Sequence, residues 1–211
     1  MGEQVSQPLD GATEATVVVE PGVGVLRVVA LPEAANLVEG NLQLAVGEKL
    51  NQEVARAGDR ATLELQTTRY GWNPFRGSSG LQRVWELGLS PAPLLQLKTS
   101  LGLGEDSLDM TGLSLSDLQT DMGVGFTRVT LPAQGRYQAS IDGAVGMTTV
   151  VIPRGLEARI RADSGLAVRV MPAGYRREGD VYSSPGYDSA KDRVDLTLSQ
   201  AIGLLEVQTQ D

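Results

Sequence analysis

The chain has 211 residues, a net charge of −8 and a pI near 4.7, and it contains neither cysteine nor histidine. The lack of both residue types excludes Ser-His-Asp triads, Cys-His dyads and most zinc sites. The acidity argues against nucleic acid or an anionic membrane surface as a partner. No apolar run is long enough for a membrane helix, so we expect no direct membrane insertion from this chain.

The N-terminal half gives mixed signals. Residues 1–10 are polar and have no signal-peptide core, so we expect a polar tail ahead of one domain over residues 11–211. Residues 32–40, with Pro at their start, permit one short helix, and residues 48–57 have apolar spacing that allows another. Residues 61–68 alternate in polarity as a strand does. We expect little or no helix overall.

Two stretches hold aromatic residues among Gly, Pro and Ser. A loop over residues 69–80 carries Tyr70, Trp72 and Phe75 between two arginines, and residues 173–188 carry Tyr175, Tyr182 and Tyr187. Exposed aromatic side chains beside arginine are typical of partner contacts. The other interpretation is that these side chains cap an end of the fold. The candidate partner-contact residues are Tyr70, Trp72, Phe75, Tyr182 and Tyr187.

An internal repeat marks the C-terminal half. A Gly opens and a Pro closes three segments that align without gaps, 125–132, 146–153 and 165–172. The steps between their glycines are 21 and 19 residues. The same step reaches Gly104 in one direction and, after two periods, Gly203 in the other, and a longer version of the segment begins at Gly24.

A period of about 20 residues with a fixed Gly predicts an all-β, single-handed β-helix, or β-solenoid, with turns of about 19–21 residues. Gly supplies the corner conformation, and each turn stacks about 4.8 Å above the last. Val129 should then stack on Val150, and Leu131 on Ile152 and Met171. Residues 94–211 would hold the regular turns and 11–93 a less regular part. The alternative is a set of ordinary hairpin strands in a β-sandwich.

Some residues near the corners have the right chemistry for a site. Residues 102–108 fit the core of a calcium-binding repeat around Asp106, but its equivalents in the next turns are Thr127 and Thr148, which supply no second carboxylate. The Gly-x-Gly pairs lack the further residues of a phosphate-binding loop. Paired aspartates at 109, 121, 142 and 163 could perform acid–base work on a glycan, although solvated turn residues explain them as well. The sequence therefore assigns no catalytic residue, no metal site and no cofactor.

Several segments, in this order, resemble the toast-rack family, which includes the C-terminal domain of LiaF-type envelope-stress proteins and related adhesin-like proteins. They are 15–20 (ATVVVE), 22–26 (GVGVL), 35–42 (ANLVEGNL), 85–94 (WELGLSPAPL), 108–113 (LDMTGL) and 123–125 (GVG). The resemblance implies a β-helix in the bacterial cell envelope or another extracytoplasmic setting, with no established catalytic residues. The anchor that many members carry is absent from this chain, which leaves a cytoplasmic location open.

These observations give three hypotheses of function. The first is a non-catalytic structural or protein-interaction module, with an envelope or membrane protein as its partner. The second is a surface module that binds polysaccharide through the aromatic loops. The third is an acid-dependent glycan enzyme on a β-helix.

Overall fold

The computed structural model describes residues 2–32, 35–69 and 83–210, and within these ranges there are strands and turns but no helix. No helix that could cross a membrane is therefore found in the described part of the chain. The all-β prediction is confirmed. The strands are β1 Gly2–Pro8, β2 Glu14–Ala30, β3 Asn36–Gln43, β4 Glu48–Ala57, β5 Arg60–Arg69, β6 Val84–Leu89, β7 Leu94–Asp109, β8 Ser114–Thr130, β9 Arg136–Ile152, β10 Glu157–Val170, β11 Arg176–Glu178, β12 Val181–Ser183 and β13 Arg193–Thr209.

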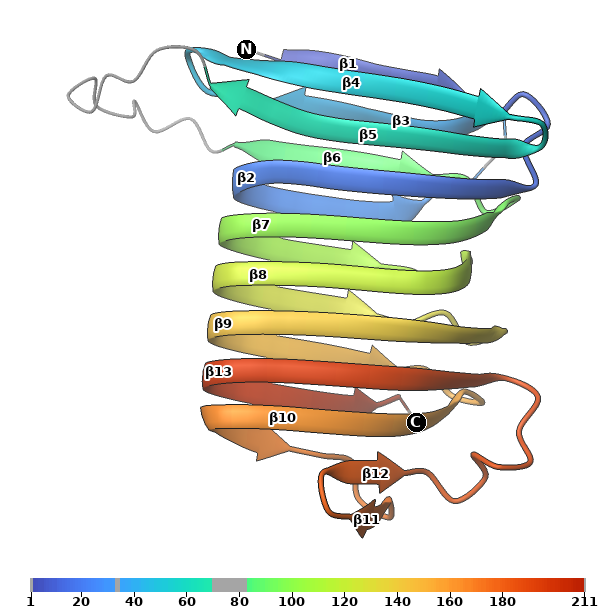
Figure 1. Cartoon of the computed structure of the whole chain (residues 1–211), viewed down its shortest axis with the longest axis vertical. Helices are drawn as coiled ribbons and strands as arrows, with labels where there is room; N and C mark the ends of the chain where they lie inside the picture. Colours follow the sequence, from blue (N-terminus) through green and yellow to red (C-terminus); the bar gives the residue numbers. More distant parts are fainter. Residues whose placement is uncertain (1, 33–34, 70–82, 211) are drawn as a thin grey trace.

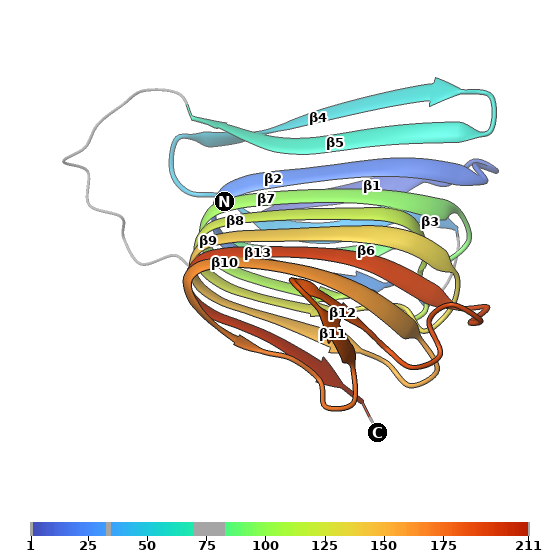
Figure 2. The same ribbon diagram turned by 60° about the horizontal axis from the view of Figure 1, so that its bottom comes forward.

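Six long strands, β2, β7, β8, β9, β13 and β10, form a stack of parallel layers (Figure 1). Each strand bends sharply in its middle, so that a first arm runs toward the bend and a second arm returns from it (Figure 2). The bends lie one above another along one edge of the molecule, which we call the corner edge. This is the β-solenoid that the repeat predicts.

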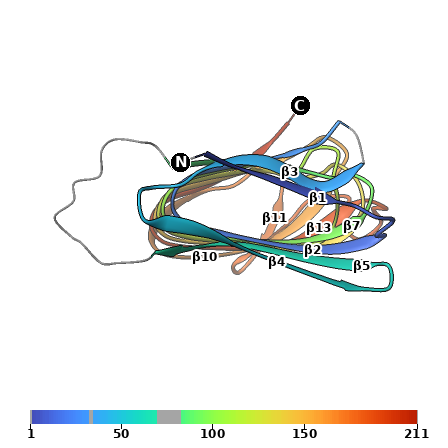
Figure 3. The same ribbon diagram turned by 90° about the horizontal axis from the view of Figure 1, so that it is seen from above.

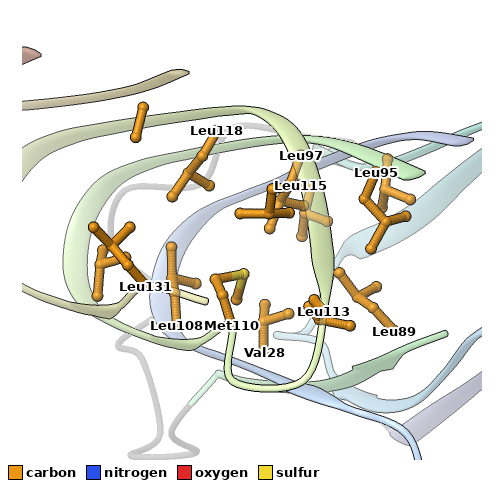
Figure 4. Packing of buried hydrophobic residues seen from close by; sticks show 14 of the residues in the cluster. Val28, Leu89, Leu95, Leu97, Leu108, Met110, Leu113, Leu115, Leu118 and Leu131 are labelled. Carbon is orange, nitrogen blue, oxygen red and sulfur yellow. The ribbon is translucent and has the colours of Figure 1, made fainter. Parts of the chain in front are cut away.

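The hydrophobic core lies between the two arms. Alternate side chains of each arm point inward, so buried and exposed positions alternate along β7 and β8. Leu97 and Leu118 of the first arms, together with Leu108 and Leu131 of the second arms and the turn beyond, belong to the same buried cluster (Figure 4). The core is thin and made mostly of aliphatic side chains, as the scarcity of aromatic residues requires.

Each bend has two corner positions with one residue between them, and glycine is needed at the second corner position. Gly104, Gly125, Gly146 and Gly203 have φ between 125° and 150°, in the region that side chains with a Cβ avoid. A Cβ on any of them would also overlap the carbonyl oxygen of the corner glycine in the neighbouring layer. The column begins with Gly24 of β2, which pairs with Gly104. Gly24 and Gly203 are therefore corner glycines, as the extended repeat predicts, but Gly203 lies one layer from Gly146 and not two layers beyond Gly165.

The order of the last layers differs from the sequence expectation. Strand β13, last in the chain, inserts between β9 and β10, so Gly203 rather than a residue of β10 pairs with Gly146. In β10 the residue opposite Gly203 is Ala167, so Gly165 lies two residues from the position that the gapless alignment gives it. Val129 pairs with Val150 as predicted. The prediction that Met171 stacks on Ile152 was wrong, because β13 lies between the segments that hold these two residues.

At the N-terminal end of the stack the single sheet branches, because the two arms of β2 pair with different strands. The first arm of β2 pairs with β5, and β5 pairs with β4 as a hairpin. The second arm of β2 pairs with β6, which continues through β3 to β1. Figure 3 shows both extensions from above. Residues 1–10 were expected to be a polar tail, but Gly2–Pro8 form strand β1. They do so because their backbone pairs with the edge of β3 and Val5 enters the core.

Two segments that permitted a helix are strands instead. Residues 36–43 are β3, whose backbone pairs on both sides with β1 and β6. Residues 48–57 are β4, in which ten consecutive residues pair with β5. Pairing with an existing strand edge outweighs the weak helical spacing, because helix propensity is a small term that tertiary contacts override. At the other end, β11 and β12 form a small hairpin on the first arm of β10.

Candidate interaction surface

An exposed column of aliphatic side chains runs along the corner edge. In each of the six layers one residue lies between the two corner positions, and these residues pair in register from layer to layer. Their exposed fractions range from 37% to 83%, although each side chain is large and apolar. We call this column the ridge, and its members are Val23, Leu103, Val124, Val145, Ile202 and Leu166.

A second column runs beside the ridge, two residues further along each strand. In β8, β9 and β10 it holds Phe126, Met147 and Val168, all exposed, and Leu204 of β13 lies half-buried between the last two. Only Glu105 of β7 interrupts it with a charge. At about 4.8 Å per layer, the two columns form an apolar strip roughly 24 Å long. Monomeric soluble proteins seldom leave so continuous a strip in water.

The charges on the two sides of the strip differ. On the first-arm side, Asp121 of β8 pairs in register with Asp142 of β9, and Asp163 of β10 occupies the same column one inserted layer further on. On the second-arm side, the corresponding column contains Arg27, Arg128 and Glu206. One side of the strip is therefore acidic and the other carries charges of both signs, and these are the charges that would steer a partner.

The aspartates that sequence analysis considered for acid–base work do not form a catalytic pair. Asp121, Asp142 and Asp163 lie on the outer face of the first arms, exposed or half-exposed. Asp109 lies elsewhere, at the end of β7, where its Oδ1 accepts a hydrogen bond of 3.0 Å from the Thr111 backbone N–H. That contact shapes a turn. Carboxylates on an open sheet face have no dry, enclosed environment in which a general acid could work.

The aromatic candidates are placed only in part. Tyr70, Trp72 and Phe75 fall outside the described residues. Tyr187 is 5% exposed, its hydroxyl donates a hydrogen bond of 2.7 Å to Asp195, and the Arg159 guanidinium lies 4.7 Å from its ring. Tyr182 is half-buried against the core beneath Arg177. Tyr182 pairs beside the last layer, β10, whereas Tyr187 packs over the outer face of β10 and β13, so neither ring is fully open to a partner.

Asp106 points into the core rather than toward solvent. Its register partners are Thr127 and then Thr148, as the repeat predicts. The carboxyl group is fully buried, and neither of its oxygens has a hydrogen-bond partner among the described residues. Burial raises the pKa of Asp106 to about 7. One carboxyl group beside hydroxyls is too few ligands for calcium, and no cluster of three acidic residues that could hold a metal occurs in the described ranges.

A groove of about 610 Å³ crosses the outer face of β2, β6, β3 and β1. It is lined by both apolar and polar side chains, among them Val29, Leu31, Asn41 and the ion pair between Arg27 and Glu86, whose atoms are 3.0 Å apart. Ser6 of β1 and Glu39 of β3 both line the groove and pair in register, but no hydrogen bond between their side chains is found among the described residues. The groove is therefore a surface depression that lies beside the corner edge.

Sequence reasoning missed the ridge, although its signal is present. Val23, Leu103 and Val124 each lie between two glycines, and the Gly-x-Gly pairs were interpreted only as corners. A corner residue flanked by glycines has no neighbouring side chains to shield it. An aliphatic residue at that position, repeated in several turns, therefore predicts an exposed apolar column.

Comparison with known proteins agrees with this fold. A crystal structure described as a "putative cell adhesion protein" from Clostridium sporogenes superposes with a TM-score of 0.85 at 23% identity, covering 100% of this chain and 99% of that one. A "putative adhesin" from Bacteroides fragilis gives a TM-score of 0.38 at 10% identity, with 98% and 96% of the two chains covered. No curated protein matches the chain. The profile of the N-terminal domain of toast_rack, DUF2154, matches residues 1–151. The chain therefore belongs to the toast-rack family.

Proposed function

We propose that this chain is a non-catalytic, adhesin-like interaction module that contacts another protein through the ridge and the column beside it. The single observation that carries the proposal is the register of six exposed aliphatic residues on six successive layers. Exposed apolar strips that lie between polar flanks are typical of protein–protein contact sites. An extracytoplasmic setting, as the description of the Clostridium protein suggests, is part of the proposal.

The lack of catalytic machinery supports this choice. The chain has no His or Cys to act as base or nucleophile, and the outer aspartates lie on an open face. The polysaccharide hypothesis relied on Trp72 and Tyr182, of which the first lies outside the described residues and the second is half-buried. No described aromatic platform favours a glycan, so the protein contact is the proposal we retain.

Site-specific photo-crosslinking in the native host tests the proposal. A photoreactive amino acid at Val145, on the ridge, should give one dominant protein adduct that excess purified chain suppresses. The matched control is Val54 on the β4–β5 hairpin, since its exposed fraction of 44% is close to the 41% of Val145. Equal labelling from both positions, or no protein adduct from Val145, would contradict a ridge-mediated contact.

A further inference from the structure

We propose that the partner of the ridge is a second copy of this chain, which packs corner edge to corner edge with the two stacks parallel. The inference rests on the proposed function, because it uses the same surface. It adds the identity of the partner and the symmetry of the complex. Three properties of the corner edge support it: its size, its charges and the shapes of its two columns.

The size of the surface fits a stable dimer. The ridge, the column beside it and the two flanking columns each take one residue from six layers, about 24 residues in one copy. Standard protein interfaces use about 20–30 residues on each side. The centre of this surface is mostly apolar, and its rim carries charged and small polar residues, as in interfaces that form in water.

The charges beside the strip favour one relative orientation of the two copies. A two-fold axis parallel to the stack keeps every layer at its own height and places the first-arm side of one copy against the second-arm side of the other. Asp121 and Arg128 lie on the same strand, β8, on opposite sides of its bend. Across the axis, Asp121 of each copy would therefore face Arg128 of the other copy, giving two symmetric Asp121–Arg128 pairs. Both side chains are exposed, and no ion pair of either is found among the described residues.

The opposite orientation is disfavoured. A two-fold axis perpendicular to the stack would place the acidic sides of both copies, with Asp121, Asp142 and Asp163, against each other. Like charges set against each other across an interface disfavour association. The parallel arrangement avoids this contact, because in β13 the residue opposite Glu206 would be Ser199 and in β9 the residue opposite Asp142 would be Thr149.

The two apolar columns complement each other in the same orientation. The two-fold axis sets the ridge of one copy against the second column of the other. In β8 this opposes the β-branched side chain of Val124 to the longer one of Phe126, and in β9 it opposes Val145 to Met147. Short and long side chains that alternate across a seam can interdigitate without voids. The acidic flank makes an anionic lipid surface a poor competitor for the same strip.

Sedimentation equilibrium of the full chain, with the matched control, tests the role of the ridge. The wild type is expected to be a dimer at micromolar concentration. V124D/V145D places charges in the centre of the seam, so we expect the dissociation constant of the dimer to rise by at least about 100-fold. V54D, on the β4–β5 hairpin, should leave the dimer unchanged. Unaltered far-UV circular dichroism will show that the variants fold.

Charge reversal tests the orientation. R128D and D121R each set like charges opposite one another in the parallel dimer, so each should raise the dissociation constant by about tenfold or more. The double variant D121R/R128D exchanges the two charges and should recover most of the wild-type affinity. In a perpendicular dimer D121R would instead relieve repulsion and tighten binding. That result, or the absence of recovery in the double variant, would overturn the parallel arrangement.

The two proposals can fail separately. A wild-type chain that stays monomeric at 100 μM while Val145 crosslinks to a different protein would overturn the dimer and leave the interaction module standing. A chain that dimerises equally well with V124D/V145D would overturn the dimer through the ridge. Adducts between two copies of the chain at Val145, together with dissociation of V124D/V145D, would support both proposals.

Discussion

Buried polar side chains line the inside of the corner edge, and their pairing is incomplete. Thr99 donates a hydrogen bond of 3.2 Å to Thr120, and Thr148 donates one of 2.7 Å to Gln200. Within residues 2–32, 35–69 and 83–210, Asp106 has no such partner. Since an unpaired charge in a dry core is costly, the carboxyl group retains its proton to a pH near 7.

This arrangement predicts that stability falls as pH rises. In the unfolded chain the pKa of an aspartate is 3.8, so between pH 3.8 and about 7 the folded state holds a proton that the unfolded state releases. The folded state therefore loses stability across this window, up to about 4 kcal/mol above pH 7. Asp106→Thr, which continues the threonine column, should remove the loss and raise the free energy of unfolding at pH 8 by about 2–4 kcal/mol.

Urea unfolding at several pH values between 4 and 8 measures this effect. The control is Glu105→Thr, which removes an exposed carboxyl group from the neighbouring position of the same strand. Glu105→Thr should keep the wild-type pH dependence. Parallel curves for the wild type and Asp106→Thr would show that Asp106 does not titrate as its burial requires.

At the scale of the element, the bent strand depends on one column of glycines. The alternation of apolar and polar residues builds each arm, and the corner glycine lets two arms meet at a sharp angle while adjacent layers remain in contact. Gly146 and Gly165 occupy similar places in the sequence repeat but not in the structure. Gly146 has φ of 138°, whereas Gly165 is not among the glycines with positive φ.

Substitution by alanine should distinguish the two glycines. In Gly146→Ala the Cβ would overlap the Gly125 carbonyl oxygen, and the backbone would be strained as well. We therefore expect the free energy of unfolding to fall by more than about 3 kcal/mol. In Gly165→Ala the nearest atom is the Ala201 oxygen at 3.0 Å, and a small shift would relieve it, at a cost of about 1 kcal/mol or less. Chemical denaturation of both variants measures the difference. Similar losses in both would contradict the observed register.

At the scale of the whole molecule, the last strand in the chain is an interior layer. Strand β13 pairs along nearly its full length with β9 on one side and β10 on the other. The contacts are long-range, since Gly203 pairs with Gly146 and Arg193 with Arg136. Closing such distant pairs is slow, so β10 and β13 are expected to complete the stack late in folding.

Hydrogen exchange can test the position of β13. Its central amides, from Leu196 to Leu205, should exchange as slowly as those of β9, although they lie close to the C-terminus, because they are paired on both sides. The amides of the β11–β12 hairpin, which makes few pairs, should exchange much faster. Rapid exchange of the peptide that contains Gly203, measured by mass spectrometry, would show that β13 is not an interior layer.

The sequence by itself determined the all-β class, the bent repeating layer and the column from Gly104 to Gly146. Those features follow from local physics: strand alternation, the φ that only glycine tolerates, and the absence of His and Cys. It also placed Thr127 and Thr148 beside Asp106. The ridge could also have been predicted from Val124 and its two glycine neighbours, but only if the corner is recognised as an exposed edge.

Only the tertiary structure decided the order of the layers. Backbone hydrogen bonds between parallel strands are the same whichever strand supplies them, so nothing local makes β13 rather than β10 the neighbour of β9. The tertiary structure likewise turned Asp106 into the core and made β1 and β4 strands by offering them open edges. Pairing between distant segments is a property of the assembled stack, and a repeat measured along the chain does not contain it.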